Sequence, residues 1–121
     1  MYFPISNFSE FKIIAENEQA ALFYFSHEDC NVCKVLKPKI EELIETFFPK
    51  IKLYFIDTKL YPEVAAQNSI FVNPTILIYF DKNEFIRKSR NFGIEELKLQ
   101  IERLYNLVFF WKTIHWFSKI K

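Results

Sequence analysis

The stretch AALFYFSHEDCNVCK, residues 20–34, decides the fold of this chain. Its first part, residues 20–25, is a short continuous apolar run, which is typical of a strand buried on both faces. Apolar residues then recur at three- and four-residue steps, and this predicts an amphipathic helix over residues 31–48. Pro38 lies inside that helix and is expected to kink it. The two cysteines of the chain, Cys30 and Cys33, therefore lie where a buried strand meets a helix.

The rest of the chain alternates in the same way. Helices are predicted over residues 7–17 and 61–68 and from residue 94 onward, and strands over residues 51–56, 75–80 and 84–89. Asp81-Lys82-Asn83 is the expected hairpin turn between the last two strands. Buried strands joined by helices predict the α/β class: a central mixed β-sheet of four to five strands, flanked by helices on both faces.

The composition of the chain excludes two classes of function. The chain has 121 residues, half of them hydrophobic and 26% charged, which suits one globular domain. Its single glycine excludes glycine-rich phosphate loops. Sixteen basic residues balance fifteen acidic ones, so no field that would attract nucleic acid is expected.

Location is also an expectation from the sequence. No signal-peptide pattern and no run of about 18 apolar residues is present, so we expect a reducing cytoplasm. A close cysteine pair in such a compartment is redox-active or metal-binding more often than structural.

The strand–helix junction favours disulfide exchange by the cysteine pair. Unpaired N–H groups and the positive end of the helix dipole favour a thiolate at Cys30 and lower its pKa, although Glu28 and Asp29 oppose this effect. Cys33, one turn on, is placed to attack a mixed disulfide formed at Cys30. A zinc site would need four ligands, and only His27 and His115 are available to add. We therefore expect neither a metal nor another cofactor.

With these residues in view, the chain resembles the thioredoxin family over roughly residues 6–109. Four features carry the resemblance: a strand leading into Cys30-x-x-Cys33, Lys34 followed by Pro38, the strand start Asn73-Pro74-Thr75, and Asn91-Phe92-Gly93 before the last helix. The resemblance implies a thioredoxin fold. It also implies a thiol–disulfide oxidoreductase of cell redox homeostasis with a redox-active disulfide.

The resemblance also implies roles for single residues. Cys30 would be the nucleophile, and Cys33 the resolving thiol. Pro74 would follow a cis peptide bond, and Asn73 would offer backbone groups to a bound polypeptide. The expected partners are protein disulfide substrates and a recycling reductase.

The chain departs from the family at several positions. Asp29 stands where most thioredoxins have Trp, and Asn31-Val32 where they have Gly-Pro. Tyr24 occupies the position of a buried Asp that helps the second cysteine lose its proton. Tyrosine is a poor base at neutral pH. His27, Glu28 and Asp29 are the candidates to transfer protons instead. The imidazole of His27 changes charge near neutrality, and the alternative for His27 is an ordinary loop residue.

Leu53, Asp57 and the charged residues of the second predicted helix have structural interpretations. Leu53 stands where the family has a buried Lys, if Asp57 is aligned with the family's strand-end Asp. Asp57 itself is expected to end a strand or cap the next helix. The charged positions within residues 37–45 are interpreted as a solvated helix face: Lys37, Lys39, Glu41, Glu42 and Glu45.

The C-terminal end is unusual for the family. We divide the chain into a thioredoxin-like domain, residues 1–109, and an aromatic, basic helical extension, residues 110–121, which has three lysines and no acidic residue. The extension has three open interpretations: contact with a membrane surface, association with a partner or a second copy, and packing on its own domain. The alternative function is a non-enzymatic binding module that acts through its peptide groove or this extension.

Overall fold

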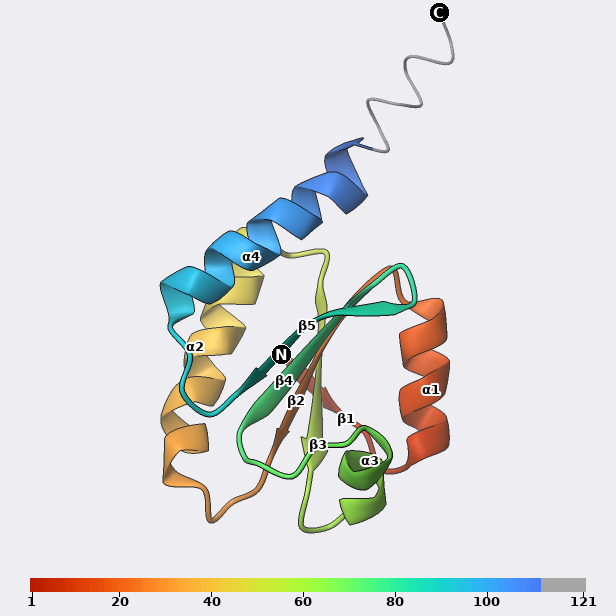
Figure 1. The fold of residues 1–121 in the computed structure, drawn as a ribbon, viewed down its shortest axis with the longest axis vertical. Helices are drawn as coiled ribbons and strands as arrows, with labels where there is room; N and C mark the ends of the chain where they lie inside the picture. The colour runs from red at the N-terminus through yellow and green to blue at the C-terminus, as the bar shows by residue number, and fades with distance from the viewer. Residues whose placement is uncertain (112–121) are drawn as a thin grey trace, which may run out of the picture.

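The computed structural model describes residues 1–111, except for the side chains of residues 31–33 and 111 (Figure 1). The elements follow in this order: β1 (Tyr2–Pro4), α1 (Phe8–Asn17), β2 (Ala20–Ser26), α2 (Asn31–Phe47), β3 (Lys52–Asp57), α3 (Pro62–Gln67), β4 (Thr75–Phe80), β5 (Asn83–Ser89), α4 (Ile94–Asn106) and a π-helical turn (Leu107–Trp111). No helix within residues 1–111 is long and apolar enough to cross a membrane.

The five strands form one mixed sheet in the order β1-β3-β2-β4-β5. β1 and β2 run parallel to β3, whereas β4 is antiparallel to both β2 and β5. The predicted α/β class and sheet are confirmed, and β1 is the strand that the sequence did not reveal. β1 has three residues and ends on Pro4, and its pairing with β3 joins segments about fifty residues apart, for example Tyr2 with Leu53.

Helices cover both faces of the sheet. Figure 1 shows α2 and α4 on one side and α1 and α3 on the other. The central strand β2 is buried along its whole length because its side chains alternate between two cores. Leu22 and Tyr24 pack in the core under α2 and α4, and Phe23 and Phe25 in the core under α1 and α3. Burial on both faces explains why β2 is a continuous apolar run.

The helix and hairpin ends follow local chemistry. The side chain of Asn7 accepts a hydrogen bond from the Glu10 amide at 2.8 Å and so caps α1. Asp81 and Lys82 adopt positive φ angles of 49° and 73°, which is the backbone of a tight hairpin turn, and β5 begins at Asn83. The predicted domain boundary after residue 109 falls inside the π-helical turn, and residues 112–121 of the predicted extension lie outside the described residues.

Candidate functional site

Cys30 lies between the end of β2 and the start of α2. Its amide donates to the carbonyl of His27 at 3.1 Å, and its own carbonyl accepts from the Lys34 amide at 3.3 Å. Cys30 thus occupies the position just before the first helical residue, where unpaired N–H groups and the helix dipole attract negative charge. The side chain is half-buried and packs against the core under α2 and α4, and Cys30 is disulfide-bonded in this structure. The side chain of Cys33 lies outside the described residues.

A surface cleft of about 420 Å³ brings Cys30 together with residues that are far away in sequence. The cleft is lined by His27, Asp29, Cys30, Phe71, Val72, Asn73 and Arg90. Three of the predicted site residues, His27, Cys30 and Asn73, therefore share one cleft. The Asn73–Pro74 peptide bond is cis, the isomer that the resemblance implies.

The segment that carries Asn73 is held by hydrogen bonds at several points. The hydroxyl of Thr58 donates to Oδ1 of Asn73 at 3.2 Å, and the Arg90 amide donates to the carbonyl of Pro74 at 2.8 Å. The hydroxyl of Thr75 donates to the carbonyl of Val72 at 2.6 Å. These bonds hold the cleft wall from the loop after β3, the start of β4 and the loop after β5.

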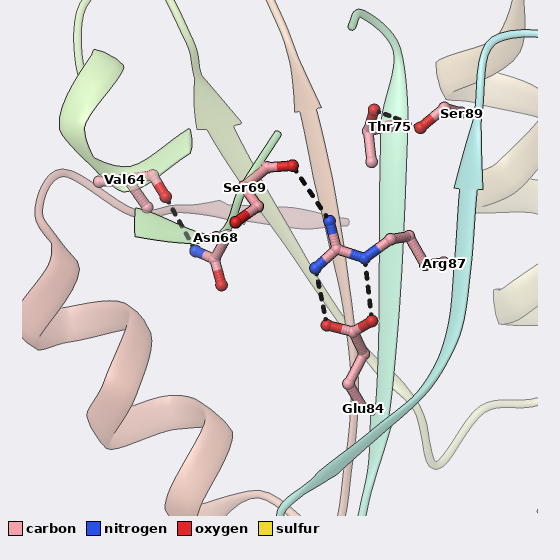
Figure 2. Close-up of polar contacts among 7 residues, drawn as sticks. All are labelled: Val64, Asn68, Ser69, Thr75, Glu84, Arg87 and Ser89. Carbon is pink, nitrogen blue, oxygen red and sulfur yellow. Dashed lines mark hydrogen bonds and ion pairs between the residues drawn. The ribbon is translucent and has the colours of Figure 1, made fainter. Parts of the chain in front are cut away.

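Figure 2 shows two further ties between β5 and this segment. Arg87 forms two hydrogen bonds of 2.9 Å with the carboxylate of Glu84, and its guanidinium also reaches the carbonyl of Ser69 at 3.5 Å. The hydroxyls of Thr75 and Ser89 are hydrogen-bonded at 3.0 Å. A two-pronged guanidinium–carboxylate pair fixes the Arg87 side chain, so that β5 supports the chain just before Phe71.

Tyr24 and Leu53 occupy the positions where the resemblance places a buried acid and a buried Lys. Both are buried, and the ring of Tyr24 packs edge-on against Tyr2 with 5.8 Å between centroids. Burial raises the pKa of Tyr24 far above its ordinary value. The phenol therefore stays protonated at neutral pH and supplies no base to the cysteines.

His27 is the half-buried residue that connects the clefts of this face. It lines the cleft of Cys30, a second cleft beside Lys34 and Lys37, and a third beside Pro62. Its Nδ1 atom is buried and has no hydrogen-bond partner among the described residues. The imidazole thus lines the same cleft as Cys30, with Nδ1 left available for a hydrogen bond.

Lys37 corrects one interpretation of the sequence. It is half-buried instead of solvated, and its ammonium lies 3.7 Å from the ring centroid of Phe55 and 5.1 Å from that of Tyr2. Desolvation lowers its pKa, although the charge of Glu41 opposes this. The sequence pattern missed this position because Lys37 of α2 lies against Phe55 of β3, a tertiary contact that helical spacing does not show.

Asp57 ends β3, as the sequence indicated, and its Oδ1 accepts hydrogen bonds from the amides of Lys59 and Leu60 at 2.9 and 3.1 Å. The resulting turn places the ammonium of Lys59 against the carboxylate of Asp29, with which it forms an ion pair. Sequence reasoning missed the partner of Asp29, Lys59, and the cleft residues Phe71 and Arg90. Each comes from a loop, where no periodic signal exists.

The sheet order, a cysteine at the start of the second helix and an adjacent cis-proline define a protein of the thioredoxin-fold class. The thioredoxin family model matches residues 4–103, so the chain belongs to the thioredoxin family. A thioredoxin-like protein of Bacillus subtilis, YdfQ, is 33% identical over 87 residues, which cover 72% of this chain and 77% of that protein. A thioredoxin of Buchnera aphidicola is 31% identical and covers 64% of this chain and 71% of its own length.

Solved structures agree on the fold. Mitochondrial thioredoxin 3 of Saccharomyces cerevisiae, in its oxidized form, has a TM-score of 0.76 at 19% identity and covers 84% of this chain and 94% of its own. A Plasmodium falciparum thioredoxin has a TM-score of 0.73 at 24% identity, with coverage of 84% and 97%. Family and fold together support a thiol–disulfide oxidoreductase at the level of the family, whose members act on protein substrates and are recycled by reductases.

Proposed function

We propose that this protein is a thiol–disulfide oxidoreductase that exchanges a Cys30–Cys33 dithiol with protein disulfides. The observation that carries the proposal is the shared cleft: Cys30, at the start of α2, opens to the same surface as Asn73, beside the cis-proline. A substrate chain lying along this cleft would present its disulfide to Cys30 and its backbone to Asn73.

The reaction balances within the two cysteines and the substrate. The Cys30 thiolate attacks one sulfur of the substrate disulfide; a Cys30–substrate bond forms, and the first substrate thiolate leaves. Cys33, as a thiolate, then attacks the Cys30 sulfur, forms the Cys30–Cys33 disulfide and releases the second substrate thiolate. Two electrons pass to the substrate, whose thiolates take up two protons. A reductase or a small dithiol returns the electrons.

His27 is our candidate for proton transfer in these steps. It lies beside Cys30 in the cleft, and its buried Nδ1 has no partner among the described residues. Tyr24 stays protonated at neutral pH, so the proton of Cys33 needs an acceptor other than the residue at the family's buried-acid position. The His27 imidazole lines the same cleft as Cys30 and can accept a proton there.

Insulin reduction by the dithiol form tests the proposal. Wild-type protein should reduce insulin and cycle between dithiol and disulfide, whereas Cys30→Ser should fall to the background rate. Cys33→Ser should accumulate a mixed disulfide with a substrate peptide, because the resolving step is lost. A wild-type protein that neither reduces insulin nor cycles would refute the proposed activity.

The proposed setting is a reducing cytoplasm, because a dithiol donor needs a compartment that keeps it reduced. Fractionation of the source cells would test this, and recovery of the protein in an oxidising compartment would contradict it.

A non-enzymatic binding module is the second candidate, and Tyr24, which provides no base, is the observation that favours it. Such a module would act through the Cys30 cleft or through residues 110–121. Deleting residues 110–121 should then abolish association while thiol chemistry stays intact. Unchanged association after the deletion would remove the extension from consideration.

A further inference from the structure

Arg90 follows β5 directly and has an unusual backbone. Its φ angle is 57°, in the left-handed region, which costs a residue with a long side chain about 1 kcal/mol or more. The amide of Arg90 is hydrogen-bonded to the carbonyl of Pro74. This conformation fixes the backbone of Arg90 beside the cis-proline and leaves the side chain exposed at the cleft that contains Cys30.

The guanidinium of Arg90 is the uncompensated charge of this cleft. Among the described residues, no carboxylate lies within ion-pair distance of Arg90. The acidic residue that lines the cleft, Asp29, is already paired with Lys59. The cleft therefore offers a planar cation with its hydrogen-bond donors open to a ligand.

The same cleft has an exposed apolar wall. Phe71 is 83% exposed, the highest value among the large hydrophobic residues described, and its neighbour Val72 is 40% exposed. An exposed phenylalanine beside the cysteine offers a binding surface, because its ring buries a large apolar area when a partner covers it. An extended polypeptide, which carries charged and apolar side chains in succession, satisfies both features, whereas a small anion satisfies only the first.

We propose that the cleft selects extended polypeptide segments in which an acidic residue flanks the disulfide cysteine and an apolar residue lies nearby. Arg90 binds the carboxylate, for which the guanidinium fork is geometrically suited, and Phe71 packs on the apolar side chain. The preference rests on the proposed disulfide exchange and names the substrate class of that site. It concerns binding alone and adds no step to the reaction.

Peptide disulfides that differ only in the residue next to the cysteine test this preference. We would compare Glu, Gln and Lys at that position and measure kcat/KM for reduction by the full chain. Wild-type protein should prefer the Glu peptide over the Lys peptide by about three- to fivefold, the range of an exposed ion pair. The preference should shrink in 0.5 M NaCl, because salt screens exposed charges.

Variants distinguish an effect of the Arg90 side chain from an effect of the net charge of the protein. Arg90→Gln should abolish the difference in kcat/KM between the Glu and Lys peptides, and Arg90→Lys should keep part of it. Arg103→Gln, an exposed arginine near the end of α4, is the matched control and should keep the full preference. If Arg103→Gln loses as much as Arg90→Gln, the effect is one of net charge and the assignment to Arg90 is wrong.

Phe71→Ser tests the apolar half of the proposal. It should reduce kcat/KM more for a peptide with Leu near the cysteine than for the same peptide with Ser, whereas Leu99→Ser, 66% exposed on α4, should affect neither. Equal rates for the Glu and Lys peptides, with the Gln peptide turned over normally, would overturn the charge preference and leave the proposed function intact. Failure to reduce any peptide would refute the function itself.

Discussion

The hydroxyl of Thr58 donates a hydrogen bond to the side-chain carbonyl of Asn73 at 3.2 Å, and the amide of Thr58 donates to the carbonyl of Ser26 at 2.9 Å. Thr58 therefore connects the end of β2, which leads to Cys30, with the residue before the cis-proline. Two segments of the cleft that are separated by more than forty residues are held in one arrangement by this residue.

Thr58→Val should impair disulfide exchange more than it impairs folding. Valine keeps the shape but removes the hydroxyl, so the side chain of Asn73 loses a partner, with an expected cost of about 1 kcal/mol in unfolding free energy. We expect kcat/KM for a peptide disulfide to fall by several fold. Thr46→Val, at an exposed position of α2, is the control and should match wild type. Equal activity of the two variants would show that Asn73 does not need this bond.

The Asp29–Lys59 ion pair should adjust the reactivity of Cys30, because Asp29 precedes the cysteine directly. A carboxylate next to a thiol disfavours the thiolate, and the ammonium of Lys59 offsets that charge. In the reduced protein, alkylation of Cys30 by iodoacetamide at pH 7 should be slower in Lys59→Gln and faster in Asp29→Asn. Exposed charges of this kind are worth about 0.2–1 kcal/mol, so roughly 1.5- to fivefold changes are expected.

The iodoacetamide comparison should be made in a Cys33→Ser background, so that one thiol reacts. Lys82→Gln, in the β4–β5 turn, controls for a general loss of positive charge. Rates that change in the same direction in Asp29→Asn and Lys59→Gln would show that the pair acts through local structure and not through charge.

The parts of the fold that follow from local pattern were predictable. β2 is a continuous apolar run because it lies at the centre of the sheet and is buried on both faces, and α2 shows helical spacing along its length. β1 was missed because three residues carry no periodicity, and its existence depends on pairing with β3. Secondary structure was thus predicted where one segment alone determines it.

The candidate site was also predictable only where neighbouring residues in the sequence determine it. The position of Cys30 at a strand–helix junction could be read from adjacent residues, whereas its proximity to Asn73 came from family resemblance and not from spacing. Lys37 was assigned to solvent because helical spacing does not show that Phe55 lies under it. No sequence pattern indicated Arg90, because its left-handed backbone and its lack of an acidic partner within the described part of the chain depend on how the loops fold.

Removal of the Tyr24 hydroxyl and removal of the His27 imidazole should differ in their effect on disulfide exchange. Tyr24→Phe removes a phenol that burial keeps protonated, so the profile of kcat/KM between pH 6 and 9 should keep its shape. His27→Gln removes the imidazole that lines the cleft of Cys30 and should lower kcat/KM by several fold. Insulin reduction measures both variants. A kcat/KM that falls in Tyr24→Phe and not in His27→Gln would reverse the assignment.

Alkaline conditions should destabilise the fold through its buried tyrosines. Burial raises the pKa of Tyr54 to about 12, with a contribution from Glu18, which its hydroxyl contacts at 3.3 Å. Burial also raises the pKa of Tyr2, Tyr24 and Tyr79. Unfolded tyrosines lose their protons near pH 10, whereas these remain protonated in the folded protein.

The folded state therefore binds more protons than the unfolded state above about pH 10, and the free energy of unfolding must fall as pH rises through that value. Lys37 acts in the opposite direction, because its lowered pKa makes the folded state release a proton first, but it is one group against four. Urea midpoints should fall only slightly between pH 7 and 9, where Glu45 and Glu41 raise the pKa of the exposed N-terminal ammonium, and should decline more steeply from pH 10 to 11. Tyr54→Phe, referenced to its own midpoint at pH 7, should decline less than wild type. An equal decline would mean that the Tyr54 phenol ionises as readily in the folded protein as in the unfolded chain.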